Sequence, residues 1–147
     1  MPLTPGTPQT SSASWRHSIL TVLLPRLLAF APDFLFVSAG FDGHSLDQLH
    51  LPAACSLTEH DYRWVTDLLV RVSNTSCQGR MVSVLEGGYN TRAGPGSPLA
   101  ESIKAHVSEM ARGSEAKVDS EWVEMRTQEV VTSGKRKFLT PLPVDMT

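Results

Sequence analysis

The chain has 147 residues, enough for one ordinary domain, and 41% of them are hydrophobic while 19% are charged. This is the composition of a globular protein, and a net charge of −2 gives no general attraction to nucleic acid. No apolar run approaches the roughly 20 residues needed to cross a bilayer, so we expect neither nucleic acid nor a membrane as partner. Two cysteines in no metal-like spacing predict reduced thiols inside a cell.

The first part of the chain predicts a helix followed by a buried strand. Residues 1–10 are rich in proline and predict a loop, and apolar residues over 15–30 then recur at helical spacing. Pro25 lies inside this pattern and costs about 3 kcal/mol in a helix interior, so we expect a kink or a new helical turn there. The unbroken apolar run that follows predicts a strand over 34–38, buried on both faces.

The middle of the chain predicts a second helix, a second strand and a third helix. Thr58 and Asp61 have the form of a capping box, with Asp in place of the usual Glu, at the start of the second helix. A short apolar run predicts a strand over 81–85, and helical spacing predicts the third helix over 99–113. The alternating order α-β-α-β-α predicts an α/β fold with parallel strands and right-handed crossovers.

The character of the sequence changes after Gly113. The apolar residues there follow no firm spacing, so residues 113–147 predict a weakly ordered polar tail with room for one short helix. The basic residues 135–137 are either a nuclear address or part of a solvated tail, and three basic residues fall short of the usual basic patch. We therefore divide the chain into a domain over 1–112 and a tail over 113–147.

Two polar side chains follow the two predicted strands. In a parallel α/β sheet ligands bind beyond the carboxyl ends of strands, where Asp42 and Tyr89 stand. We expect the Asp42 carboxylate and the Tyr89 hydroxyl to face one shared concavity. From the residues alone, two structural interpretations stay open: Asp42 caps a turn, and Tyr89 is a packed aromatic ring with a solvated hydroxyl.

Two motifs together bring a known family into view. Residues 38–44, Ser-Ala-Gly-Phe-Asp-Gly-His, and residues 85–90, Leu-Glu-Gly-Gly-Tyr-Asn, resemble the histone deacetylase and acetylpolyamine amidohydrolase family. The tyrosine in the second motif resembles the class II-like type of this family. The resemblance covers roughly residues 1–112 and implies the C-terminal half of the catalytic domain. It also implies an arginase/deacetylase-type parallel sheet with helices on both faces.

The resemblance assigns roles to particular residues. It implies that Asp42 is a ligand of a catalytic Zn²⁺ and that Tyr89 is catalytic, donating to the oxyanion that develops on the substrate. The implied substrates are proteins with acetylated lysine, such as histone tails, and the implied location is the nucleus, the cytoplasm or both. Co-regulator proteins are implied as further partners. The residues implied to bind substrate or support the site are Gly87, Gly88, Phe41 and Asp47.

The sequence also departs from the family pattern. The tandem histidines that serve as general base and acid, and the Asp-x-His segment that supplies the other two zinc ligands, are not found in it. Asp42 to His44 has the form Asp-x-His by accident, and each histidine is expected to be an isolated surface side chain.

Three functions remain open at this point. The chain is part of a deacetylase domain that is silent by itself, a non-catalytic interaction module or truncated isoform derived from one, or an unrelated nucleotide-binding α/β domain. The pair of motifs disfavours the third.

Overall fold

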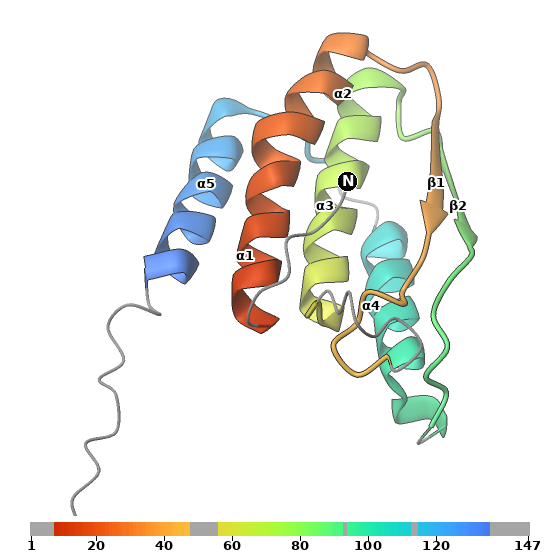
Figure 1. Ribbon diagram of the computed structural model, residues 1–147. Coiled ribbons are helices and arrows are strands. Elements are labelled where there is room, and N and C mark those ends of the chain that lie inside the picture. Colours follow the sequence, from red (N-terminus) through yellow and green to blue (C-terminus); the bar gives the residue numbers. More distant parts are fainter. Residues whose placement is uncertain (1–7, 48–55, 93, 113–114, 136–147) are drawn as a thin grey trace, which may run out of the picture.

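The structure, a computed structural model, describes residues 8–47, 56–92, 94–112 and 115–135 (Figure 1). Its helices lie in one layer beside a small sheet, and within the described residues no helix is long and apolar enough to cross a membrane. In chain order the elements are α1 (Pro8–Ser18), the π-helix η1 (Ile19–Leu23), α2 (Leu24–Phe30), β1 (Leu35–Ala39), α3 (Glu59–Ser76), β2 (Met81–Leu85), the 3₁₀ helix η3 (Gly94–Gly96), α4 (Pro98–Arg112) and α5 (Ser120–Lys135).

The first helical segment is continuous but changes its winding before Pro25. Helix α1 begins at Pro8, earlier than the predicted loop over 1–10 allowed. The N–H of Leu24 donates to the carbonyl of Ile19, five residues back, as in a π-helix. Because proline has no N–H to donate, α2 restarts the α-helical pattern with Pro25 in its first turn. The predicted new turn at Pro25 is thereby confirmed.

Strands β1 and β2 pair in parallel, with Leu35 opposite Met81 and Ala39 opposite Leu85. The prediction of two parallel strands is confirmed, with the first strand displaced by one residue. The expectation of burial on both faces is wrong for the described residues: Phe36 is 66% exposed and Val82 is 43% exposed.

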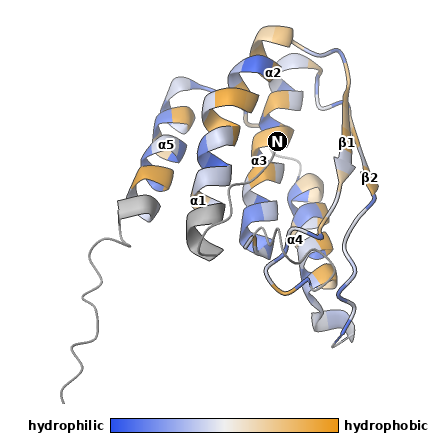
Figure 2. Ribbon diagram, in the orientation of Figure 1, coloured by the Kyte–Doolittle hydropathy of each residue, from blue (hydrophilic) through white to orange (hydrophobic). Residues whose placement is uncertain are grey.

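The reason is the position of the helices. They all lie on one side of the two strands in Figure 1, and Figure 2 shows hydrophobic residues along β2. The expected layer of helices on the second face is absent from the part of the chain that the structure describes. Alternate side chains of each strand therefore point away from the helical layer into solvent.

The main core lies within the helical layer rather than against the sheet. Leu68 and Val72 of α3 are fully buried, and Trp122 and Val130 of α5 pack into the same cluster. Helix α5 differs from the weakly ordered polar tail expected after residue 112. Trp122 and Val130 are eight residues apart and fall on one helix face, which is enough to anchor the helix. The basic residues 136 and 137 lie outside the described residues.

The start of α3 is tied to α1 through one carboxylate. Asp61 accepts a hydrogen bond from the backbone N–H of Thr58 at 2.8 Å, as the predicted capping box requires. The same carboxylate accepts from Arg16 Nε at 2.7 Å and from the Ser12 hydroxyl at 2.5 Å. Asp61 is only 2% exposed, so this buried charge is stabilised by several donors at once.

Candidate functional site

The two loops that carry the predicted site leave the same end of the sheet, because β1 and β2 run in parallel. The pairing of the backbones continues beyond the strands. The N–H of Glu86 donates to the carbonyl of Ala39 at 3.0 Å, and the N–H of Phe41 donates to the carbonyl of Gly87 at 2.8 Å. The loops are therefore held side by side up to Asp42.

The carboxylate of Asp42 occupies space that two glycines leave open. A Cβ atom on Gly87 would stand 2.6 Å from Asp42 Oδ1, and one on Gly40 would stand 3.0 Å from it. Side chains at these positions would displace the carboxylate. Asp42, placed on the first loop, is thereby brought into contact with the second loop.

Gly88 requires the conformational freedom of glycine. Its φ is 120°, and an added Cβ would lie 2.5 Å from a methyl carbon of Leu99 and 3.1 Å from the Cβ of Phe41. The turn at Gly88 presents the next residue, Tyr89, at the surface, where it is 54% exposed. Phe41 itself is buried, with its ring packed edge-on against Tyr62 at 5.0 Å.

Asp47 fastens the first loop to the second. Its side chain is buried, and Oδ2 accepts hydrogen bonds from the backbone N–H of Tyr89 at 2.7 Å and of Asn90 at 3.2 Å. The Asn90 side chain returns a hydrogen bond to the carbonyl of Leu46 at 2.6 Å. This is the geometry that a site-supporting residue needs, since it fixes the backbone from which Tyr89 projects.

His44 is not the isolated surface side chain that was expected. It is 6% exposed; its Nδ1 accepts from the N–H of Leu46 at 3.1 Å, and its Nε2 lies 3.4 Å from a carboxylate oxygen of Glu59. The pKa of Glu59 is lowered, because the Glu59 carboxylate accepts a hydrogen bond from the backbone N–H of Glu59 itself. The hydrogen bond with His44 lowers this pKa further. Both ring nitrogens therefore serve to hold the loop.

His106 on α4 is also buried, against the same expectation. Its Nδ1 lies 2.7 Å from the hydroxyl of Thr66, and its Nε2 lies 2.8 Å from the hydroxyl of Ser83 on β2. The Thr66 hydroxyl donates to the carbonyl of Tyr62 at 2.6 Å, so it accepts from Nδ1–H and leaves Nε2 to accept from Ser83. Burial lowers the pKa of His106, which favours this neutral form.

Two cavities, of about 420 and 410 Å³, border the sheet, and Phe41 and His106 line both. The first lies between β2 and α4, and the second lies between β1, η1 and α3. Asp42 and Tyr89 line neither of them, so the shared concavity predicted for these two side chains stays a prediction.

The metal-binding capacity of the described residues is limited. Among them, no group of three or more His, Cys, Asp or Glu side chains is placed to hold a metal ion. The described residues therefore do not complete a three-ligand metal site around Asp42. The sequence analysis missed Gly40, His44 and Asn90 as supports of the two loops, although all three lie inside the two motifs. Their contacts with Gly87, Glu59 and Leu46 join residues that are distant in the sequence, so spacing does not reveal them.

Comparison with known proteins identifies the family. A family model described as the histone deacetylase domain matches residues 1–110, three quarters of the chain and both loops of the site. The chain belongs to the histone deacetylase family. The resemblance seen in the two motifs is thereby confirmed, and an unrelated nucleotide-binding domain is excluded.

Individual relatives agree with this assignment. Type-2 histone deacetylase 2 of Dictyostelium discoideum is 32% identical over 109 residues, covering 74% of this chain and 6% of that protein. Histone deacetylase 15 of Arabidopsis thaliana is 42% identical over 72 residues, covering 49% of this chain and 12% of that protein. The crystal structure of the HDA15 HD domain superimposes with a TM-score of 0.54 and 27% identity, covering 86% of this chain and 33% of that one.

These coverages define what the histone deacetylase assignment includes. The chain spans 6–7% of the length of the first two Dictyostelium relatives and a third of the solved domain. It carries part of a histone deacetylase domain, with the arginase/deacetylase-type α/β arrangement of a parallel strand pair and flanking helices.

Proposed function

We propose that this chain supplies the Asp42 and Tyr89 part of a zinc-dependent lysine deacetylase site. The observation that carries the proposal is the joining of the two loops at one end of the parallel strands. The Asp42 carboxylate lies against Gly87, and Asp47 accepts hydrogen bonds from the backbone of Tyr89. Two motifs more than 40 residues apart in the sequence are in this way supported as one unit.

Asp42 is proposed as a zinc ligand. Its carboxylate fits this role, because Gly40 and Gly87 leave a recess that a side chain would fill. A catalytic zinc site has three protein ligands and one open position, and no group of three possible ligands occurs among the described residues. The other two ligands would come from the rest of a deacetylase domain. Zinc bound there would supply a Lewis acid and an activated water.

Tyr89 is proposed as the catalytic hydrogen-bond donor. Its half-exposed side chain is available to a substrate, and a donor aimed at a developing oxyanion is worth about 2.7–4 kcal/mol. Asp47 would fix the backbone of Tyr89, Gly88 would permit its turn, and Phe41 would anchor the first loop in the core.

The wider assignment follows from the family. We propose proteins with acetylated lysine, such as histone tails, as substrates of the complete domain, co-regulator proteins as further partners, and the nucleus, the cytoplasm or both as location. Residues 1–112 would form the deacetylase part, and residues 113–147 would be an addition whose helix α5 packs on it.

A second function is favoured by the uncovered sheet face. Phe36, Val82 and Val84 are neighbours on paired strands and are each at least 40% exposed. A contiguous apolar face of this kind is typical of a protein interaction surface. The alternative is therefore a non-catalytic interaction module or truncated isoform of a deacetylase.

The test joins residues 1–112 to the remaining part of an active deacetylase domain and measures zinc content and turnover of acetyl-lysine peptides. Tyr89→Phe should keep the zinc and lose about 10²–10³-fold in kcat. Asp42→Ala should lose the zinc. Tyr62→Phe is the matched control, since it also removes a tyrosine hydroxyl, but from a buried ring of α3, and it should keep both zinc and turnover. Unchanged turnover in Tyr89→Phe would contradict the proposed catalytic role.

The 147-residue chain alone should be inactive on the same peptides, because a catalytic zinc site needs three protein ligands and the described residues contain no group of three. Turnover by the purified chain with added zinc, abolished in Asp42→Ala, would show that the chain completes the site by itself. If neither the chain nor the joined domain turns over the peptides, although the joined domain binds zinc, the interaction module is favoured.

A further inference from the structure

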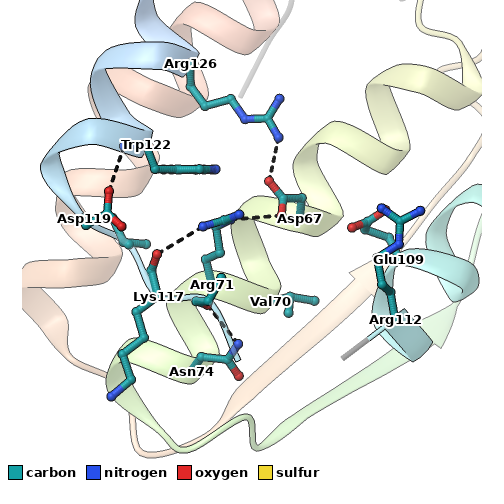
Figure 3. A network of polar contacts seen from close by, with 12 residues as sticks. Asp67, Val70, Arg71, Asn74, Glu109, Arg112, Lys117, Asp119, Trp122 and Arg126 are labelled. Atoms are coloured by element: carbon teal, nitrogen blue, oxygen red, sulfur yellow. Dashed lines mark hydrogen bonds and ion pairs between the residues drawn. The ribbon is translucent and has the colours of Figure 1, made fainter. Parts of the chain in front are cut away.

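A pocket rich in arginine lies between α3, α4 and α5 (Figure 3), and its lining includes no residue of the two loops that carry Asp42 and Tyr89. Its volume is about 340 Å³, and its lining includes four guanidinium groups but only two carboxylates. With His60 neutral, the lining therefore carries a net positive charge. The four arginines of this arginine pocket are Arg63, Arg71, Arg112 and Arg126.

The two carboxylates of the pocket already have partners. Asp67 accepts from Arg71 Nε at 3.0 Å and from Arg126 Nη2 at 2.6 Å, as Figure 3 shows. Glu109 lies 3.6 Å from a guanidinium nitrogen of Arg112. Arg126 also donates to Glu129, which lies outside the lining, at 2.9 Å. With this third carboxylate counted, the four arginines keep an excess of one positive charge.

Three buried donors of the pocket have no acceptor among the described residues. They are the indole N–H groups of Trp64 and Trp122 and the Nε–H of Arg126. Trp64 is 4% exposed and Trp122 is 5% exposed, and Figure 3 shows the nitrogen end of Trp122 directed toward the ion pair of Arg126 with Asp67. Buried N–H groups are almost always hydrogen-bonded, so these donors lack an acceptor that such groups normally have. The three nitrogens have almost no accessible surface, so an acceptor in the pocket would reach them only after neighbouring side chains move.

Two further arginines stand at the rim. Arg63 is exposed and has no ion-pair partner within the described part of the chain, and the Arg112 side chain is 69% exposed. Both are long enough to turn toward a ligand in the pocket. A ligand suited to this lining is negatively charged and offers acceptor oxygens to guanidinium and indole N–H groups together.

We propose that the arginine pocket binds a phosphate group. A phosphate offers three or four acceptor oxygens and up to two negative charges, and the planar guanidinium fork pairs with it through two parallel hydrogen bonds. Helix α5 lies beyond residue 110, where the match to the histone deacetylase family ends, so the part of the pocket lined by Trp122, Met125 and Arg126 is outside that match. The proposal does not rest on the proposed deacetylase function.

The first test uses the three indole N–H signals of the ¹⁵N-labelled full-length chain. Titration with pyrophosphate should shift the signals of Trp64 and Trp122, which gain an acceptor, and leave that of Trp15, which does not line the pocket. Sodium chloride at the same ionic strength is the control. Equal shifts with chloride, or no shift at Trp64 and Trp122, would overturn the proposal.

The second test is affinity, followed by tryptophan fluorescence at low protein concentration. Removing the two rim arginines in the double variant Arg63→Ala, Arg112→Ala should weaken pyrophosphate binding by about tenfold or more, since charge-assisted hydrogen bonds are lost. Arg26→Ala, an exposed arginine of α2 outside the pocket, is the matched control and should bind as the unmodified chain does. An equal loss in both variants would mean nonspecific attraction and would overturn the site.

Parallel titrations with O-phosphoserine separate the two sources of a phosphate group. Tighter binding of pyrophosphate assigns the pocket to a free phosphate compound, and tighter binding of O-phosphoserine assigns it to a phosphorylated side chain. Either result supports the site, and absence of binding for both compounds overturns it.

Discussion

The helical side and the sheet side of this molecule differ in how far each is closed. On the helical side Leu68 and Val72 are fully buried, and α5 covers them with Trp122. On the sheet side Phe36 and Val84 remain 66% and 40% exposed. Burial of apolar area stabilises a fold by roughly 25 cal/mol per Å², so most of this stabilisation comes from the helical side. Among the described residues, the apolar side chains of the helical side are covered and those on the outer face of the sheet are exposed to solvent.

The largest effect should come from opening the closed side. Trp122→Ala removes a side chain that is 5% exposed and that lies under the guanidinium of Arg71, 5.1 Å from the ring centroid. We expect a loss of about 3–5 kcal/mol in the free energy of unfolding, the usual cost of deleting a buried tryptophan. Urea unfolding followed by circular dichroism measures it.

Met125→Ala is the matched control on the same helix, because Met125 is 54% exposed. It should cost less than about 1 kcal/mol. Equal, small losses in Trp122→Ala and Met125→Ala would mean that α5 is the weakly ordered tail expected from the sequence, and the contrast between the two sides would fail.

A second test changes Gly88, which lies where the loop after β2 contacts α4. Gly88→Ala would place a Cβ 2.5 Å from Leu99 at a φ of 120°, so we expect a loss of about 1–3 kcal/mol in unfolding free energy. Gly96→Ala is the control, since its added Cβ meets nothing within 4 Å. A thermal unfolding curve for Gly88→Ala that matches the Gly96→Ala curve would contradict this account of the turn.

The sequence predicted those features that depend on neighbouring residues. Short apolar runs located β1 and β2, the spacing of Thr58 and Asp61 located the start of α3, and Pro25 located the change in winding. Each of these is decided within one or two turns of chain, where a side chain and the backbone group that it serves are close in sequence.

The features that the sequence did not predict depend on contacts between distant residues. His44 and His106 have no local sign of burial; the partners of His106 are 23 and 40 residues away. The sequence allowed one short helix after residue 112 but did not predict its packing, because α5 has few apolar residues on its buried face and packs against α1 and η1. For the site, the two motifs located the loops. The hydrogen bond from the backbone of Tyr89 to Asp47, which joins the loops, links residues 42 apart and does not follow from either motif.

A smaller effect should follow acidification, through the network that joins the helices to β2. Burial lowers the pKa of His106 in the folded state below its value of about 6.5 in the unfolded chain. The unfolded state therefore binds more protons, and unfolding free energy should fall as the pH drops below about 6.5, by at most about 1.4 kcal/mol per pH unit.

The His106→Gln variant isolates this contribution, because the amide keeps a donor and an acceptor but does not titrate. Urea unfolding at pH 7 and pH 5.5 should show a smaller decrease for the variant than for the unmodified chain. The comparison stays above the range in which Glu59 titrates, since the pKa of Glu59 is lowered from 4.5. The same decrease in both proteins would show that His106 carries none of it.

The smallest change in stability, and a clear change in association, should come from the open sheet face. Phe36 is opposite Val82 in the strand pairing, so their exposed side chains form one apolar patch beside free strand edges. Such a patch favours self-association, and the double variant Phe36→Thr, Val82→Thr should reduce it while changing unfolding free energy by only about 0.5 kcal/mol. Phe30→Thr is the control, because Phe30 is 79% exposed but is the last residue of α2 and belongs to neither strand. Sedimentation velocity over a range of concentrations should show the unmodified chain and Phe30→Thr associating, and the double variant remaining monomeric. If all three proteins are monomeric, the exposed apolar face of the sheet does not drive self-association, and this prediction is wrong.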